Sequence, residues 1–420
     1  MAVSERLPSY AVFAAMLSAA GLPIYIHAPK FYVDEFGVSL AALGTVLFLL
    51  RLLDVFQDPA LGWLSRRLRH HRAAAVAVGS GLMAVSMVGL FGVTPPIRPI
   101  FWFALTLAGL FSGFSFLTIT FYAQGVSKAD AMGEGGHVRL AAWRETGALL
   151  GVSLAAVAPV ALLALTDAPF RTFAWAFACV AVLAVIGMRR EWRATDRAST
   201  PGIRPILSDP LARRLLLIAL VNATPVAVTS TLFLFFVESR LEAPGWEGPL
   251  LLLFFLAAAA AAPVWGRVAA AVGPKPALIA GMILAILSFG CAALLGPGDA
   301  VLFALICLAS GASLGADLTL LPAMFAARLE RIAPEAAEGF GLWSFVSKFT
   351  LAFAAVTLLP LLELQGFQTG DTTASPPGEA LFTLTLMYAV LPCILKLFAL
   401  ALLATTPIDG AQAARTLKEV

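Results

Sequence analysis

Long apolar segments recur along the chain, and they limit its possible folds more than any other feature. Each holds about 20 mostly apolar residues, the length that a helix needs to cross a bilayer. The sequence is 60% hydrophobic and 13% charged, whereas a soluble domain carries about 25% charged residues. We therefore predict a membrane protein whose surroundings are mostly lipid. The segments lie near 7–28, 40–63, 73–93, 100–122, 140–164, 170–188, 215–236, 248–268, 277–295, 301–325, 340–362 and 381–404.

One long polar stretch, 189–214, divides these segments into two sets of six. It contains seven arginines, and its prolines and glycine argue against one continuous helix. We predict an all-α membrane protein of twelve transmembrane helices in two six-helix bundles. The predicted domains are an N-terminal bundle (1–188), a cytoplasmic linker (189–214) and a C-terminal bundle (215–420).

Basic residues predict the orientation. The loop 65–72 and the linker together hold eleven arginines. The loops predicted on the other side of the membrane hold only isolated arginines. The positive-inside rule then places both termini and the linker on the cytoplasmic side of the inner (plasma) membrane. The lipid bilayer and a small-molecule substrate are the expected partners of a monomer, since no basic stripe suggests nucleic acid. The four cysteines lie within apolar runs, so we interpret them as packing residues and expect no metal site there.

A faint internal repeat supports two parallel halves. A Pro-x-x-Gly pattern occurs at 59–62 and again at 263–266, and basic residues follow it both times. We expect each pattern to end a helix, the second and the eighth. Two parallel halves are common among secondary transporters.

The strongest polar feature lies in the segment 40–63. Arg51, Asp54 and Asp58 are spaced i, i+3, i+7 and therefore share one helical face. Asp54 lies roughly 20 Å from either end of its predicted helix. Two acids one turn apart repel each other, and a proton or a hard cation such as sodium relieves that repulsion. The alternative is a structural Arg51–Asp54 pair, with Asp58 capping the cytoplasmic helix end.

Lys348 is the matching cation in the second half of the chain. It lies about nine residues into its segment, and a lysine at that depth needs an acidic partner. Asp54 or Asp58 is one possible partner. Asp317 within the C-terminal half is the other.

Several further polar and aromatic residues are candidates for lining a substrate cavity. Arg144, beside Trp143 and Glu145, suits a polar or anionic solute; the alternative is anchoring at the membrane surface. Lys30 is expected to reach towards the headgroups, and His27 is either a proton site or a satisfied core group. The cavity candidates are Tyr25, His27, Gln57, Tyr122, Gln124, Arg144, Asn222 and Trp343.

The quoted residues carry a family resemblance. The run 31–40, followed by Arg51, Asp54, Asp58, Pro59 and Gly62, resembles the glycoside–pentoside–hexuronide:cation symporters, the melibiose-permease-like family of the major facilitator superfamily. The resemblance implies a major facilitator fold and cation binding by Asp54 and Asp58. It also implies that Arg144 lies near the solute and that 341–348 carries the family's lysine, Lys348.

Two departures bear on the substrate. The sugar permeases of that family carry acids in their first and fourth helices. Here no acid precedes Asp34 in the first segment, and none lies between Phe101 and Tyr122. The departures put sugar recognition of that type in question and favour protons over sodium.

We therefore expect a secondary symporter coupled to H⁺ or Na⁺, working by alternating access, with Arg51 and Lys348 as electrostatic partners of the acids. Its solute would be small and polar or amphiphilic, such as a sugar or glycoside. The alternatives are a proton-driven exporter of a hydrophobic compound and a non-transporting regulator that kept the fold. No nucleotide, dinucleotide or zinc-hydrolase motif is present, so we expect no enzyme and no cofactor besides the coupling ion.

Overall fold

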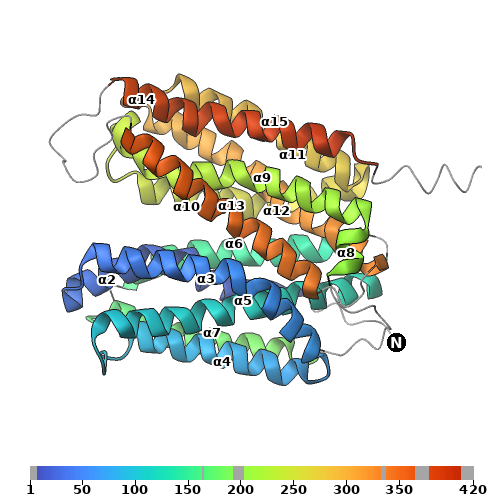
Figure 1. The fold of residues 1–420 in the computed structure, drawn as a ribbon, viewed down its shortest axis with the longest axis horizontal. Coiled ribbons are helices and arrows are strands. Elements are labelled where there is room, and N and C mark those ends of the chain that lie inside the picture. The colour runs from blue at the N-terminus through green and yellow to red at the C-terminus, as the bar shows by residue number, and fades with distance from the viewer. Residues whose placement is uncertain are drawn as a thin grey trace, which may run out of the picture. The chain divides into compact units, whose positions relative to one another are not determined.

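The computed structural model describes residues 7–133, 135–162, 165–192, 203–332, 337–364 and 378–407. Within these ranges the regular structure is helical, without strands (Figure 1). The α-helices are α1 (Leu7–Ala19), α2 (Leu22–Phe36), α3 (Leu40–Arg67), α4 (Arg72–Phe91), α5 (Pro99–Ala131), α6 (Gly136–Leu162), α7 (Pro169–Met188), α8 (Arg204–Ser208), α9 (Pro210–Phe235), α10 (Glu247–Val272), α11 (Pro274–Gly290), α12 (Ala300–Ile332), α13 (Ala337–Leu364), α14 (Gly378–Thr385) and α15 (Leu391–Ala404).

Eight helical spans in the described ranges are long and apolar enough to cross a membrane. Every predicted apolar segment coincides with one or two observed helices, so the predicted class, an all-α membrane protein, is confirmed. The count of twelve membrane crossings stays a prediction. The eight spans are Arg69–Phe91, Pro99–Ala131, Pro169–Met188, Pro210–Arg240, Glu247–Val272, Pro274–Leu294, Ala300–Ile332 and Gly378–Ala404.

Several boundaries differ from the sequence prediction. The first segment is two helices, because α1 ends at Ala19 and α2 begins at Leu22 with a proline in its first turn; proline lacks the N–H that a continuous helix needs. Pro59 and Pro263 lie inside α3 and α10 instead of ending them, as membrane helices tolerate. The linker is also shorter than predicted, since α9 begins at Pro210.

Internal packing divides the chain into two compact units. The first comprises 1–203 and 329–348, and the second comprises 204–328 and 349–420. The change at 203/204 falls inside the predicted linker. The segment 329–348, by contrast, packs with the first unit although it lies within the predicted C-terminal bundle. α13 therefore contributes its first twelve residues to the first unit and the rest to the second.

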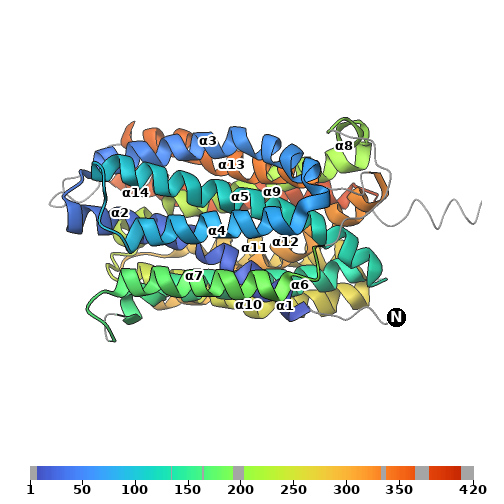
Figure 2. The same ribbon diagram turned by 90° about the horizontal axis from the view of Figure 1, so that it is seen from below.

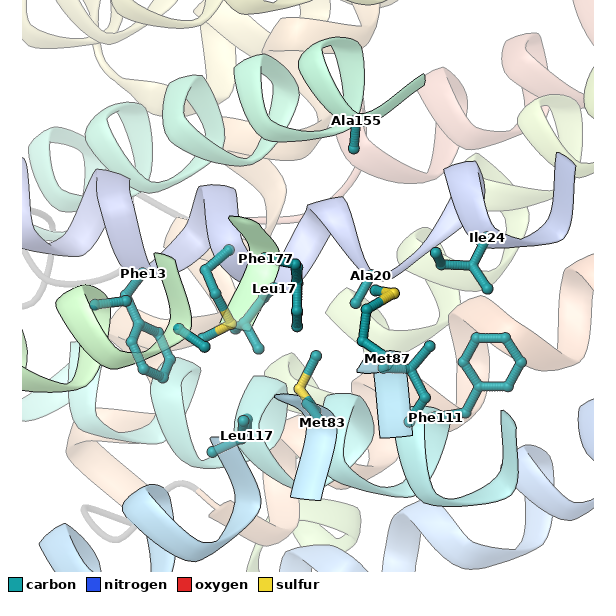
Figure 3. Packing of buried hydrophobic residues seen from close by; sticks show 14 of the residues in the cluster. Phe13, Leu17, Ala20, Ile24, Met83, Met87, Phe111, Leu117, Ala155 and Phe177 are labelled. Atoms are coloured by element: carbon teal, nitrogen blue, oxygen red, sulfur yellow. The ribbon is translucent and has the colours of Figure 1, made fainter. Parts of the chain in front are cut away.

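In the first unit, α5 packs against both α3 and α4, and α4 also packs against α7 (Figure 2). Apolar side chains of α1, α2, α4, α5, α6 and α7 fill the space between these helices (Figure 3). Phe13, Met83 and Met87 are among those with no exposed surface. Because lipid tails are as apolar as these side chains, close packing has to supply much of the stabilisation.

The tightest helix contact in the first unit joins α6 to α1. A Cβ atom on Gly147 would lie 2.1 Å from the carbonyl oxygen of Ala11, and one on Gly151 would lie 2.3 Å from that of Ala15. Real Cβ atoms do not approach so closely, so only glycine fits at these positions. Such small-residue faces let helix backbones meet in membranes.

The second unit has a similar contact and two irregular turns. Gly311 and Gly315 of α12 lie against the backbone of α10. π-helical turns follow α9 (η2, Phe236–Arg240) and precede α15 (η4, Leu386–Val390). Phe236 and Tyr388, one from each turn, stack with ring centroids 4.1 Å apart and planes 14° apart.

Candidate functional site

Asp54 and Asp58 project from the same face of α3, one turn apart. The helix begins at an N-cap, where the Ser39 hydroxyl accepts a hydrogen bond from the N–H of Ala42 at 3.3 Å. Asp58 has no exposed surface and Asp54 is buried. Their spacing follows from the helical period, and their burial means that each negative charge needs a partner.

The partner is Lys348 on the first-unit part of α13. Its ammonium lies 3.0 Å from Asp58 Oδ2 and 3.1 Å from Asp58 Oδ1, and 3.8 Å from Asp54 Oδ2. It also donates a hydrogen bond to Ser115 Oγ at 2.6 Å, and Ser344 donates one to Asp58 Oδ2 at 2.5 Å. The Lys348 side chain is 13% exposed, so two carboxylates share one ammonium with little solvent around it.

Gln57 completes this cluster on the α3 side. Its amide donates to Asp54 Oδ1 at 2.7 Å, and its carbonyl oxygen accepts from Ser112 Oγ at 3.0 Å. Gln57 therefore links Asp54 to α5.

Two glycines bring α13 close enough to α3 for these contacts. A Cβ on Gly341 would lie 3.1 Å from the carbonyl oxygen of Asp58, and one on Gly62 would lie 3.1 Å from that of Ala337. One turn further along α3, Arg66 forms an ion pair with Glu338. The start of α13 is thus held on α3 by backbone contact and by ion pairs on both sides of it.

These contacts bear on two of the open alternatives. Lys348 is paired with the helix α3 acids, so the alternative pairing with Asp317 is wrong. Asp58 does not cap a helix end either, because α3 continues to Arg67. The side chain of Arg51 lies outside the described residues, and so do those of Tyr25 and Lys30.

A second cluster surrounds Arg144. Its guanidinium is buried, lies 3.6 Å from the centroid of the Tyr122 ring, and donates from Nε to Glu145 Oε1 at 2.7 Å. Tyr122 donates to the same oxygen at 2.8 Å. The Nη2 atom of Arg144 is buried without a hydrogen-bond partner among the described residues. A buried guanidinium is not an anchor at the headgroups, and its spare donor suits an oxygen of a bound solute.

The remaining candidates are mostly engaged elsewhere. His27 is partly buried and donates from Nε2 to the carbonyl oxygen of Ala156 at 2.8 Å. Gln124 accepts from Arg72 Nη1 at 2.5 Å, and Asn222 lies in the second unit, where it accepts from Lys396. Trp343 is half-buried on α13.

Sequence reasoning missed the serines of the first cluster and the pairing of Lys396. Ser344 lies one turn before Lys348, a spacing that could have indicated it. Ser112 and Ser115 are spaced i, i+3 and share one face of α5, but this spacing does not show which helix that face meets. Lys396 is an ionisable residue within an apolar segment, which is itself a pointer to a polar cluster.

The spans and the buried charge clusters define a class, the multi-pass α-helical membrane transporters. Within that class, the chain belongs to the family described as MFS/sugar transport protein, whose model matches residues 8–410. It is thus a member of the major facilitator superfamily.

Solved structures agree on the fold. The chain is similar to a bacterial homologue of the iron transporter ferroportin in an outward-facing state, with a TM-score of 0.66 at 16% identity, covering 94% of this chain and 99% of that one. The same homologue soaked with iron gives a TM-score of 0.66 at 14% identity, covering 94% and 98%. At such low identity the likeness concerns the fold alone. No curated protein matches the chain.

Proposed function

We propose that this transporter is a cation-coupled symporter of the melibiose-permease-like family, and that Asp54 and Asp58 bind the coupling ion. The observation that carries the proposal is the buried cluster in which two carboxylates share the Lys348 ammonium. Two carboxylates one turn apart repel each other when both are ionised. A bound H⁺ or Na⁺ relieves that repulsion, and ionised groups deep in a membrane protein are costly.

The geometry suggests how ion binding couples to movement. Asp58 holds Lys348 and Ser344, and so it helps to hold the start of α13 on α3. A cation that binds Asp58 competes with these same donors. Ion binding and release of α13 are then linked, because a ligand shifts an equilibrium by its difference in affinity for the two states. This is the relation that alternating access requires.

The serines of α5 bear on the choice of ion. Where the sugar permeases carry an acid in the corresponding helix, this chain carries the hydroxyls of Ser112 and Ser115, which bond Gln57 and Lys348, the neighbours of the two acids. Fewer charged oxygens make a poorer cage for sodium, while a proton needs only one carboxylate. We therefore favour the proton.

For the solute we propose a small polar or amphiphilic molecule with oxygen acceptors, such as a glycoside. Arg144 offers its unpartnered Nη2, and the ring of Tyr122 lies against the same guanidinium. Both side chains belong to the first unit. We further propose that the protein lies in the inner membrane with both termini cytoplasmic, as its arginine-rich loops favour.

Proteoliposomes test the proposal. Uptake of a panel of labelled glycosides is measured under an inward proton gradient, an inward sodium gradient or neither. The wild type should accumulate a solute under one gradient. Asp58→Asn should abolish accumulation but keep exchange of solute across the membrane, because exchange need not release the ion. Glu35→Gln, which alters an exposed acid outside the cluster, is the matched control. Gradient-driven accumulation by both Asp54→Asn and Asp58→Asn at the wild-type level would refute the assignment.

A further inference from the structure

The second unit contains a buried charge cluster of its own, separate from the one on α3. Lys396 of α15 donates to Asn222 Oδ1 of α9 at 2.7 Å and forms an ion pair with Asp317 Oδ2 of α12. The side chains of Lys396 and Asp317 are 5% and 8% exposed. Asp317 lies 17 residues after the start of α12 and 15 before its end, roughly 23 Å or more from either.

Stability alone does not explain this cluster. A buried ion pair gains little or nothing over well-packed apolar residues of the same volume. Ionisable groups deep in membrane helices instead mark ion or substrate pathways by default. The three side chains come from three different helices, so any shift of one helix changes the pairing.

The cluster is also incompletely satisfied. Asp317 Oδ1 is buried and has no hydrogen-bond partner among the described residues. An ionised carboxylate oxygen without a donor is costly. In the described structure the ammonium, which can donate three hydrogen bonds, has only the two partners named above. The oxygens of Asn222 and Asp317 are thus arranged like the ligands of a cation site. The ammonium of Lys396 lies where the cation would bind.

The helix that carries Lys396 has a place where it can shift. The π-helical turn η4 ends at Val390, six residues before Lys396, and Pro392 follows in the first turn of α15. A π turn holds one extra residue, and such turns are frequent at functional sites. Its conversion to α-helix would rotate the residues after it by about 100°, enough to withdraw Lys396 from Asp317.

We propose that Asp317 and Asn222 form a second proton site, which Lys396 occupies as a built-in cation and vacates when α15 shifts. One proton from water then binds the exposed carboxylate of Asp317, which becomes a neutral carboxyl group. The site takes protons and is independent of the ion site proposed on α3.

Other ionisable groups on the neighbouring helices do not provide an alternative partner in the described structure. The remaining charged side chains lie towards helix ends, and the other titratable groups are uncharged thiols and a phenol. The charged residues are Arg213, Arg214, Glu247, Arg267, Lys275, Arg328, Glu330 and Arg331, with Glu238 and Arg240 in η2; the thiols and the phenol are those of Cys291, Cys307, Cys393 and Tyr388.

The test removes the built-in cation and needs no transport substrate. Purified Lys396→Met protein in detergent is compared with wild type from pH 5 to pH 9 for its melting temperature and for its infrared carboxyl band. The variant should melt several degrees below wild type at high pH, approach it at low pH as Asp317 binds a proton, and gain a protonated-carboxyl band. That band should be absent from Asp317→Asn/Lys396→Met, whose melting temperature should stay close to that of wild type at every pH.

Two controls separate this proposal from the others. In an Asp58→Asn background the Lys396→Met effects should be unchanged, so the result does not depend on the coupling site. Replacing choline chloride by sodium chloride at fixed pH should have no effect. A Lys396→Met melting curve that falls equally at every pH, or one that sodium restores, would overturn the proton site.

Discussion

The ion pair of Lys348 offers the sharpest quantitative test of the first cluster. Lys348→Met keeps most of the side-chain volume but removes the ammonium that lies 3.0 Å from Asp58 and 3.8 Å from Asp54. It also removes the hydrogen bond to Ser115. The two acids, one turn apart, then lose the ammonium that they share.

The cost follows from these distances. With an effective dielectric constant of ~20, the ammonium attracts the Asp58 carboxylate by about 5 kcal/mol and that of Asp54 by about 4 kcal/mol. Desolvation of the three groups offsets much of this attraction. Removing one member of a buried pair costs about 3–5 kcal/mol. We expect Lys348→Met to lose that much free energy of unfolding at neutral pH, and Asp58→Asn/Lys348→Met to recover most of it.

Reversible unfolding by sodium dodecyl sulfate in mixed micelles measures these differences. Lys275→Met is the control, because Lys275 lies at the start of α11 and, among the described residues, donates to two backbone carbonyl oxygens. Lys275→Met should lose about 1 kcal/mol of free energy of unfolding. The reasoning fails if Lys348→Met is as stable as Lys275→Met, or if the double variant is no more stable than Lys348→Met alone.

Three further results are expected. Gly147→Ala should destabilise the protein by about 1–3 kcal/mol through overpacking. Gly81→Ala should leave the stability unchanged, because its Cβ meets nothing within 4 Å. Equal melting temperatures of these two variants would contradict the α1–α6 contact. The hydrogen-bonded ion pair with Arg328 lowers the pKa of Asp209 from its usual 3.8. This ion pair therefore stabilises the fold above pH 3.8, and its contribution is lost as the pH falls further. Asp209→Asn keeps the helix cap but removes the charge, so it should lower the free energy of unfolding by about 1 kcal/mol at pH 7. In acid, where Asp209 of the wild type is itself neutral, the two proteins should be equally stable. A difference that stays the same at every pH would exclude this dependence on the charge of Asp209. Arg144→Lys should weaken solute binding at least tenfold without changing the ion dependence, because lysine lacks the planar fork of donors; equilibrium binding of the transported glycoside measures it, and unchanged affinity would place the solute elsewhere.

The sequence predicted the membrane class and the burial of Asp54, Asp58 and Lys348 because depth and helical face follow from spacing alone. It could not choose between Asp58 and Asp317 as the partner of Lys348. That choice depends on which helices meet, and apolar periodicity reports a face without naming its neighbour.

The break between α1 and α2 shows a different limit. The run 7–28 is apolar throughout, so hydropathy indicated one helix. Gly21 and Pro23 were the local signals of a break, but membrane helices often continue through such residues, as α3 does at Pro59. Composition therefore located the segments better than it located their interruptions.

Two contacts with α3 fix the register of the first part of α13. Gly341 lies against the backbone of Asp58 and Gly62, and Lys348, two turns later, pairs with the carboxylate of Asp58. One residue inserted between Gly341 and Lys348 would turn the lysine by about 100° relative to the glycine, so only one of these contacts could be kept. Insertions and deletions between these two residues should therefore be far less tolerated than substitutions of the exposed side chains there.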